Sequence, residues 1–182
     1  MKLIPMKKAE FSAIYDRLEQ NFIREERRSR EDAEAILEHS QYVVYHAVSD
    51  GERVGFITVW ELEGFAFAEH FVVYEAFRNR GYGAEILTEL KEIYPRIVLE
   101  AEPPTGEMQR RRIGFYERNG FCRNPQPYLQ PSYYEGEDGV ELVVMSYPAL
   151  LADFDGAVAQ IYKTVYGKIR QKERKYDRLE GV

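Results

Sequence analysis

The sequence is poor in cysteine and has no long apolar run, and each shortage excludes a class of protein. Cys122 is the one cysteine among 182 residues, so an intrachain disulfide is impossible and a cysteine-based zinc site is not expected. No run approaches the roughly 18 apolar residues of a membrane-spanning helix. The first residues also lack the apolar stretch of a signal peptide. We therefore expect a cytoplasmic protein that needs neither a membrane nor a metal.

The sequence also has no excess of positive charge. Its 25 Lys and Arg stand against 31 Asp and Glu, which gives a net charge of −6. Proteins that bind nucleic acids gain much of their affinity by neutralising phosphates, so nucleic acid is not an expected partner. An acidic chain is compatible with a cationic small substrate. The 14 Tyr and 10 Phe provide large rings for a substantial core.

Hydrophobic periodicity predicts an alternation of strands and helices through most of the chain. Turn sequences at Asp50-Gly51 and at 61–64 join three successive strand patterns, which predicts an antiparallel meander. The charged run 25–32 is expected to be a solvated loop and a helix start. The expected strands are 3–5, 42–48, 54–60, 65–73, 97–101, 121–123 and 140–147, and the expected helices are 7–21, 33–39, 83–94 and 107–119. This order predicts an α+β fold.

Residues 149–176 carry a separate pattern of apolar residues at helical spacing. Asp155-Gly156 interrupts this pattern, which leaves open whether one helix or two are present. The charged end, 170–178, is expected to fray. We divide the chain into a main domain, 1–148, and a helical C-terminal extension, 149–182. The extension could pack on its own sheet or join two copies, so both a monomer and a homodimer remain open.

A glycine-bearing turn at residues 78–83 (RNRGYG) lies between a predicted strand and a predicted helix. The N-terminus of a helix carries unpaired N–H groups and a partial positive charge, so it binds anions. Gly81 and Gly83 let a ligand approach the backbone, and the Arg78 and Arg80 guanidinium groups suit phosphate. The turn is neither a dinucleotide fingerprint, which would need glycine in place of Ile86, nor a P-loop, since no Gly-Lys-Ser/Thr occurs.

The pattern Arg-x-x-Gly-x-Gly that begins at Arg78 resembles the acetyl-CoA pyrophosphate loop of the GNAT superfamily of N-acetyltransferases. A second segment, 113–121 (IGFYERNGF), is similar to the hydrophobic-Tyr-Glu-x-x-Gly-Phe segment of that family. The order of predicted elements over residues 3–147 is also that of the GNAT fold. The resemblance implies a mostly antiparallel central sheet, with one splayed pair of parallel strands, flanked by helices.

The resemblance further implies direct transfer of an acetyl group from acetyl-CoA to a primary amine, without an acyl-enzyme intermediate. A non-catalytic acyl-CoA sensor of the same fold is the alternative. Gln109 stands where the family often has Asn, which puts its contact with the cofactor in doubt. The residues expected to bind acetyl-CoA are Val72, Val73, Arg78, Asn79, Arg80, Gly81, Tyr82, Gly83, Ala84 and Gln109.

The predicted acid is Tyr116, which matches the family tyrosine near the CoA sulfur and is protonated at neutral pH. The predicted base is Glu69, because we expect burial to raise the pKa of its carboxyl group toward neutrality. His70 is a competing base, expected on the opposite face of the strand. Glu100 and Glu102, spaced to share one face, are expected to bind the amine or relay its proton. Tyr134 is expected in an acidic, tyrosine-rich groove for the amine.

Overall fold

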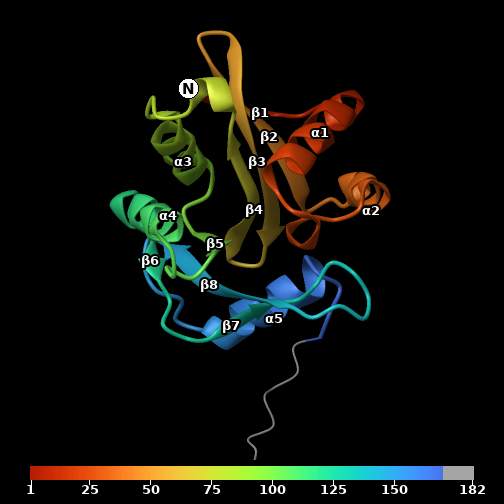
Figure 1. The fold of residues 1–182 in the computed structure, drawn as a ribbon, viewed down its shortest axis with the longest axis vertical. Helices are drawn as coiled ribbons and strands as arrows, with labels where there is room; N and C mark the ends of the chain where they lie inside the picture. The colour runs from red at the N-terminus through yellow and green to blue at the C-terminus, as the bar shows by residue number, and fades with distance from the viewer. Residues whose placement is uncertain (170–182) are drawn as a thin grey trace, which may run out of the picture.

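A mixed β-sheet of eight strands forms the centre of the structure, a computed structural model that describes residues 1–169 (Figure 1). The strand order is β1-β2-β3-β4-β5-β8-β6, and β7 pairs separately with β8. All neighbours are antiparallel except β4 and β5, which are parallel. The strands are β1 (Lys2–Pro5), β2 (Tyr42–Ser49), β3 (Glu52–Leu62), β4 (Phe65–Val73), β5 (Ile97–Ala101), β6 (Cys122–Arg123), β7 (Tyr128–Gln130) and β8 (Val140–Tyr147). The predicted α+β fold is confirmed.

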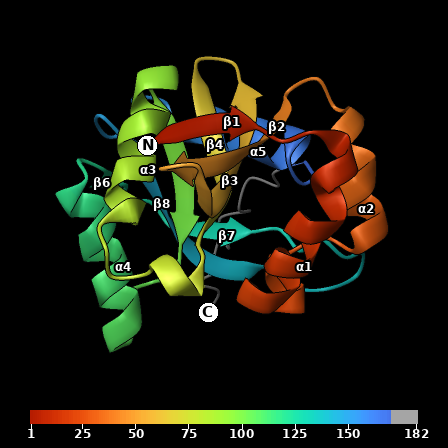
Figure 2. The ribbon, with the colours of Figure 1, turned by 90° about the horizontal axis from the view of Figure 1, so that it is seen from above.

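Helices cover both faces of the sheet. Viewed from above, α3 and α4 lie on one side of it and α1 and α2 on the other (Figure 2). One-turn 3₁₀ helices occupy Lys8–Glu10, Arg24–Glu26, Ile36–Glu38 and Glu75–Phe77. The α-helices are α1 (Phe11–Asn21), α2 (Arg30–Ala35), α3 (Tyr82–Ile93), α4 (Glu107–Arg118) and α5 (Phe154–Thr164).

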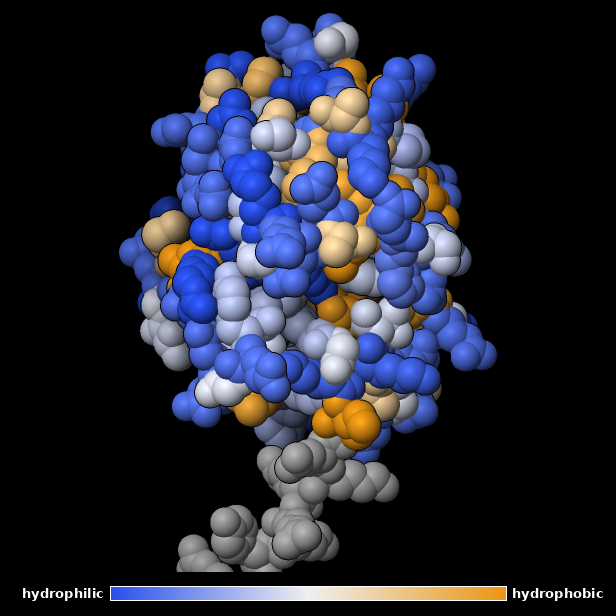
Figure 3. All heavy atoms as spheres, turned by 90° about the vertical axis from the view of Figure 1, so that its right-hand side faces the viewer, coloured by the Kyte–Doolittle hydropathy of each residue, from blue (hydrophilic) through white to orange (hydrophobic). Residues whose placement is uncertain are grey.

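The alternation of β3 divides the core between the two faces. Phe56 packs with the apolar face of α1, and Trp60 packs with α5. Ile57 and Val59 point the other way, into the cluster that α3 and α4 cover. The outer surface on the α1 and α2 side is mostly hydrophilic, with a small apolar group near its centre (Figure 3).

The C-terminal extension packs on the chain's own sheet. Among the described residues it contains one helix, α5, so the predicted interruption at Asp155-Gly156 is wrong. The Asp153 carboxylate caps the helix by accepting a hydrogen bond of 2.9 Å from the Gly156 N–H, which places the glycine in the first turn. Residues 170–178, expected to fray, lie outside the described residues. The buried side of α5 (Phe154, Val158, Ile161) covers Trp60, Phe67, Val98 and Val144.

The parallel pair β4 and β5 separates shortly after it forms. Pairing is restricted to Ala66–Ala68 on β4 and Ile97–Leu99 on β5. Beyond these residues β4 continues to pair with β3, and β5 continues to pair with β8. The two halves of the sheet therefore diverge at their facing edges, as the predicted splayed pair requires.

The packing of α5 predicts that Ile161→Ala destabilises the whole protein. Ile161 is fully buried, and truncating a buried isoleucine to alanine costs about 2–5 kcal/mol of unfolding free energy. Leu150→Ala is the matched control, because Leu150 precedes α5 and is 52% exposed. Urea denaturation of both variants checks the prediction. Equal midpoints for the two variants would mean that α5 does not share the core.

Candidate active site

A cleft of 740 Å³ opens where β4 and β5 diverge. It lies between the end of β4 (68–73) and the end of β5 (99–102), with residues from the α1 end, α4 and the β7–β8 region around it. The predicted site residues that line it are Glu69, Val72, Val73, Arg78, Glu100, Glu102 and Tyr116. Asn79, Arg80, Gly81, Tyr82, Gly83, Ala84, Gln109 and Tyr134 lie outside this lining.

The predicted phosphate loop forms the N-terminus of α3. Gly81 is the N-cap and adopts a left-handed conformation, with φ of 85°. Within residues 1–169, the N–H groups of Gly81, Tyr82 and Gly83 donate to no backbone or side-chain acceptor. The N–H of Ala84 is already used, in a 3.0 Å hydrogen bond to the Gly81 carbonyl. Three adjacent unpaired donors at the start of a 12-residue helix make an anion site.

The two glycines of this loop serve different purposes. A Cβ on Gly81 would meet nothing within 4 Å, so glycine is favoured there by the positive φ alone. A Cβ on Gly83 would lie 3.2 Å from the Phe115 ring, so the absence of a side chain lets α3 approach α4. Gly83 is therefore a packing residue, in addition to the ligand approach expected from the sequence.

Arg78 holds the loop against its neighbours. Its Nε donates to the Val73 carbonyl at 3.2 Å, and its Nη2 donates to Asn21 Oδ1 at 2.8 Å. Two of its donors are thus committed to the end of β4 and the end of α1. Arg80 lies beside the Phe77 ring, 6.0 Å from its centroid.

The edge of β4 offers backbone groups to the cleft. The N–H of Tyr74 donates to the Val54 carbonyl at 2.9 Å, and Val72 pairs with Phe56, so these alternate residues direct their backbone groups toward β3. Phe71 and Val73 therefore direct theirs toward the cleft. Phe71 was missed in the sequence reading, although the alternation of the strand would have indicated it.

Glu69 sits on a β-bulge and is held by a cation. Thr58 pairs with His70 and Val59 with Ala68, which leaves Glu69 as the extra residue of β4. The Arg28 guanidinium donates to Glu69 Oε1 in a short hydrogen bond. The Tyr133 hydroxyl also donates to Oε1, at 3.0 Å, and Trp60 Nε1 donates to Oε2 at 3.0 Å.

Burial alone would raise the pKa of Glu69, but the Arg28 charge and these hydrogen bonds lower it below its ordinary value. The predicted rise toward neutrality is therefore wrong, because Arg28 reaches the carboxylate from a distant part of the sequence. The run 25–32 is likewise not wholly solvated, since Arg28 is only 7% exposed.

His70 is also engaged on both ring nitrogens. Its Nδ1 lies 3.2 Å from Thr58 Oγ1, and its Nε2 lies 3.0 Å from the Glu26 carbonyl oxygen. Burial lowers the pKa of the imidazole. The bulge also brings Nδ1 within 3.7 Å of Glu69 Oε2, where a regular strand would have separated the two side chains onto opposite faces.

Glu100 is a buried carboxylate in the cleft whose hydrogen-bond donors are neutral phenols. The Tyr128 hydroxyl donates to its Oε1 in a short hydrogen bond, and the Tyr166 hydroxyl donates to its Oε2 at 2.7 Å. Within residues 1–169 it forms no ion pair. Burial raises the pKa of Glu100 to about 7, although both phenols act in the opposite direction. A carboxyl group that exchanges its proton near neutral pH suits general base chemistry.

The other two predicted substrate residues are already partnered. Glu102 Oε2 accepts a 2.6 Å hydrogen bond from Arg112, and its Oε1 accepts one of 3.3 Å from Gln109 Nε2. β5 ends at Ala101, so Glu102 turns to α4 while Glu100 stays with the sheet. The Tyr134 ring is covered by the Arg24 guanidinium, 3.7 Å from its centroid.

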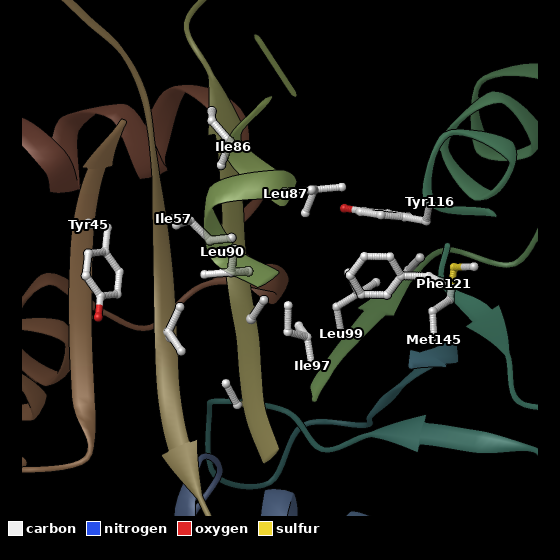
Figure 4. Packing of buried hydrophobic residues seen from close by; sticks show 14 of the residues in the cluster. Tyr45, Ile57, Ile86, Leu87, Leu90, Ile97, Leu99, Tyr116, Phe121 and Met145 are labelled. Atoms are coloured by element: carbon white, nitrogen blue, oxygen red, sulfur yellow. The ribbon is translucent and has the colours of Figure 1, made fainter. Parts of the chain in front are cut away.

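Tyr116 presents a free hydroxyl group to the cleft. Its ring is buried between α4 and α3, with the oxygen end directed toward Leu87 (Figure 4). Among the described residues no group forms a hydrogen bond with this hydroxyl. Burial raises the pKa of Tyr116 to about 12, so the phenol stays protonated at every physiological pH.

Several residues at the site were not singled out from the sequence, above all Arg28 and Tyr166. Glu26 is another: it lines the cleft, and burial raises the pKa of its carboxyl group. The described part of the chain contains no cluster of His, Cys, Asp and Glu arranged to hold a metal ion. Over the same residues, no helix has the length and apolar character needed to cross a membrane.

The environment of Glu100 predicts a pH-dependent stability. Its pKa in the folded protein, about 7, lies above the ordinary 4.5, so the stability linked to its proton is lost as pH rises through 7. The unfolding free energy of the wild type, minus that of Glu100→Gln, should fall by about 2–3 kcal/mol between pH 5 and pH 8. Glu141→Gln, at an exposed position of β8, is the control. Chemical denaturation across this range checks the difference, and parallel curves for wild type and Glu100→Gln would contradict it.

Comparison with known proteins identifies the family. The model of the acetyltransferase (GNAT) family matches residues 10–121, which is more than half of the chain. No curated protein sequence matches the chain. A solved structure of a GNAT-family protein from Bacteroides thetaiotaomicron is 32% identical, with a TM-score of 0.84, and the match covers 92% of this chain and 99% of that one.

More distant structures share the fold. The ribosomal-protein-S18-alanine N-acetyltransferase of Escherichia coli is 19% identical with a TM-score of 0.56, over 85% of this chain and 97% of that one. A spermidine N-acetyltransferase of Vibrio cholerae is 12% identical with a TM-score of 0.58, over 86% of this chain and 99% of that one. The family model and the Bacteroides structure cover both motifs and the cleft between β4 and β5, and the chain belongs to the GNAT family of acetyltransferases.

Proposed function

We propose that the protein transfers the acetyl group of acetyl-CoA directly to a primary amine of a small molecule or peptide, without an acyl-enzyme intermediate. One observation carries this proposal: a carboxyl group with a pKa of about 7, Glu100, and an unpartnered phenol, Tyr116, line the same cleft. These are the two groups that an amine nucleophile and a thiolate leaving group need.

The backbone around the cleft supports acetyl-CoA as the acyl donor. The unpaired N–H groups of Gly81, Tyr82 and Gly83 suit a pyrophosphate. The backbone groups of Phe71 and the N–H of Val73 suit the amides of an extended pantetheine arm, which would add to β4 as a further strand does, while the Val73 carbonyl already accepts a hydrogen bond from Arg78. The predicted set also includes Arg78, Asn79 and Arg80. Val72 and Ala84 are weaker members, because the Val72 backbone pairs with β3 and the Ala84 N–H already donates to the Gly81 carbonyl. Gln109 is the weakest member, because its amide already contacts Glu102.

Glu100 would accept the proton of the amine as the new C–N bond forms. Glu69, the base predicted from the sequence, is the weaker candidate, because its ion pair with the Arg28 guanidinium holds the pKa of its carboxyl group below the ordinary value. When bound, acetyl-CoA supplies the activated acetyl group, and CoA departs as a thiolate that takes its proton from solvent.

Tyr116 would donate a hydrogen bond to the leaving sulfur as the C–S bond breaks. A thiol has a pKa of about 8.5, so full proton transfer from a phenol with a pKa of about 12 is unfavourable. Its contribution is therefore to stabilise negative charge on sulfur, and the pKa of about 12 keeps the phenol in its donor form throughout.

The charges around the cleft favour a cationic acceptor. Among residues 1–169, neither Glu26 nor Glu100 forms an ion pair, so both carboxylates can attract an ammonium group. Glu102 is already neutralised by Arg112, and Tyr134 already stacks with Arg24. These two predicted residues would therefore contribute less to acceptor binding than Glu26 does.

The direct test is release of free CoA thiol from acetyl-CoA across a panel of amines. The panel contains polyamines, aminoglycosides, free amino acids and peptides with Lys or a free N-terminus. We expect thiol release with at least one amine class, and a product whose mass is increased by one acetyl group. Tight binding of CoA with no thiol release across the panel would instead support the acyl-CoA sensor.

Gly81→Glu should abolish acetyl-CoA binding. A carboxylate at the loop would repel the pyrophosphate and displace its charge-assisted hydrogen bonds, which raises Kd by about 100-fold or more. Gly64→Glu is a matched control, because Gly64 has a φ of 86° and also has nothing within 4 Å of its Cβ position, but it precedes β4. Calorimetric titration with acetyl-CoA measures both variants. Retained affinity in Gly81→Glu would eliminate this loop as the phosphate site.

Tyr116→Phe should lower turnover much more than it lowers affinity for acetyl-CoA. The variant keeps the buried ring and removes the hydroxyl, so kcat should fall by about 10- to 100-fold. Tyr94→Phe is the control, because the Tyr94 hydroxyl donates to Glu61 away from the cleft. Steady-state kinetics and acetyl-CoA titration separate the two effects. An unchanged kcat would remove Tyr116 from the mechanism.

A further inference from the structure

The chain that follows α5 returns beneath the cleft. Tyr166 is 8% exposed, and its hydroxyl donates to Glu100 Oε2 at 2.7 Å. One residue earlier, the Val165 carbonyl accepts a short hydrogen bond from Arg28 Nη2. Arg28 in turn holds Glu69. The same two residues of the C-terminal extension therefore support both carboxylates that lie where β4 and β5 part.

The position of this segment is fixed by the packing of α5. Ile161 and Val158 are fully buried on the sheet, which places the last turn of the helix against the cluster that contains Trp60 of β3 and Val98 of β5. The Val165 N–H donates to the Ile161 carbonyl at 2.9 Å, so the chain keeps a helical course up to the contact. Carbonyl groups at the end of a helix lack intrahelical donors and attract cations, which accounts for Arg28 at Val165.

The Glu100 carboxylate has one phenol donor on each oxygen. Tyr128 approaches Oε1 from β7, and Tyr166 approaches Oε2 from the end of α5. The Tyr133 ring, from the loop before β8, packs against the Tyr166 ring with 5.1 Å between centroids and an angle of 46° between the ring planes. Glu69, on β4, is the other charged group that acts on Glu100, and it disfavours a second negative charge. The neighbour on β8 is Val144, which is apolar.

We propose that Tyr166 is a positioning residue of the acetyl-transfer site: its hydroxyl fixes the Glu100 carboxylate, so residues of the C-terminal extension complete the site. The inference rests on the proposed function, in which Glu100 is the base. The family model matches residues 10–121, and the inference also assigns a role to a part of the chain that lies after them.

Loss of the Tyr166 hydroxyl has a defined electrostatic consequence. Its hydrogen bond stabilises the ionised form of Glu100, so removing it leaves a buried carboxylate with a single donor from Tyr128. The carboxyl group then holds its proton to a higher pH. At a pH below neutrality a smaller fraction of the protein has a competent base, while acetyl-CoA binding is unaffected.

The experiment compares Tyr166→Phe with Tyr162→Phe. Tyr162 lies four residues earlier, in the last turn of α5, and its hydroxyl donates to the Leu129 carbonyl. In Tyr166→Phe, the acidic limb of kcat/KM against pH should move up by about 0.5–1 unit, a fall of about 3- to 10-fold at pH 6 that recovers at pH 9. The KM for acetyl-CoA should stay constant. In Tyr162→Phe, the acidic limb of kcat/KM against pH should stay at its wild-type position.

A second readout does not depend on activity. The glutamate carboxyl carbons are labelled with ¹³C and observed by NMR. The Glu100 resonance is the one that disappears in Glu100→Gln, and its chemical shift is then followed against pH. Its titration should move to higher pH in Tyr166→Phe and also in Tyr128→Phe, which removes the other donor, on β7. An unchanged titration or an unmoved acidic limb in folded Tyr166→Phe overturns the inference. A displaced titration in a protein that acetylates no amine would instead overturn the proposed function and leave the Tyr166 contact standing.

Discussion

The separation of β4 from β5 is the constraint on which the rest of the site depends. The strands share three paired positions, Ala66–Ala68 with Ile97–Leu99, and then each stays with its other neighbour. Backbone groups that face each other across this gap lack sheet partners, which is costly inside a protein unless a ligand or water supplies them. The bulge at Glu69 stands at the point of separation, where Arg28, Trp60 and Tyr133 hold its carboxylate. The fold thus maintains an unpaired edge and places buried polar side chains beside it.

The two carboxylates at this gap differ because their partners differ. Both are buried, and burial by itself raises the pKa of each. Glu69 has a guanidinium group against it and stays ionised. Glu100 has two phenol donors and no cation; the phenols compensate burial in part, the Glu69 charge adds to the rise, and the pKa of Glu100 is about 7. One carboxylate therefore serves the architecture and the other is available for proton exchange, a division of roles that environment alone can produce.

Local patterns in the sequence were sufficient for the elements and for the loop. Alternation predicted β2, β3, β4 and β8 to within a few residues, and the glycine turn predicted the start of α3. The partners of the carboxylates were not predictable in this way. Arg28 meets Glu69 across 41 positions, and Tyr166 meets Glu100 across 66. Such contacts follow from the topology of the sheet and the docking of α5, and the charged run 25–32 gave no sign that one of its arginines is buried.

The central claim is that acetyl-CoA lies along the free edge of β4, with its sulfur between Tyr116 and Glu100. A crystal structure of the protein with bound CoA measures this directly. We expect the pyrophosphate on the N–H groups of Gly81, Tyr82 and Gly83, and the sulfur within hydrogen-bonding distance of the Tyr116 hydroxyl. CoA bound elsewhere, or a cleft filled by side chains with the thiol remote from Tyr116, would contradict it.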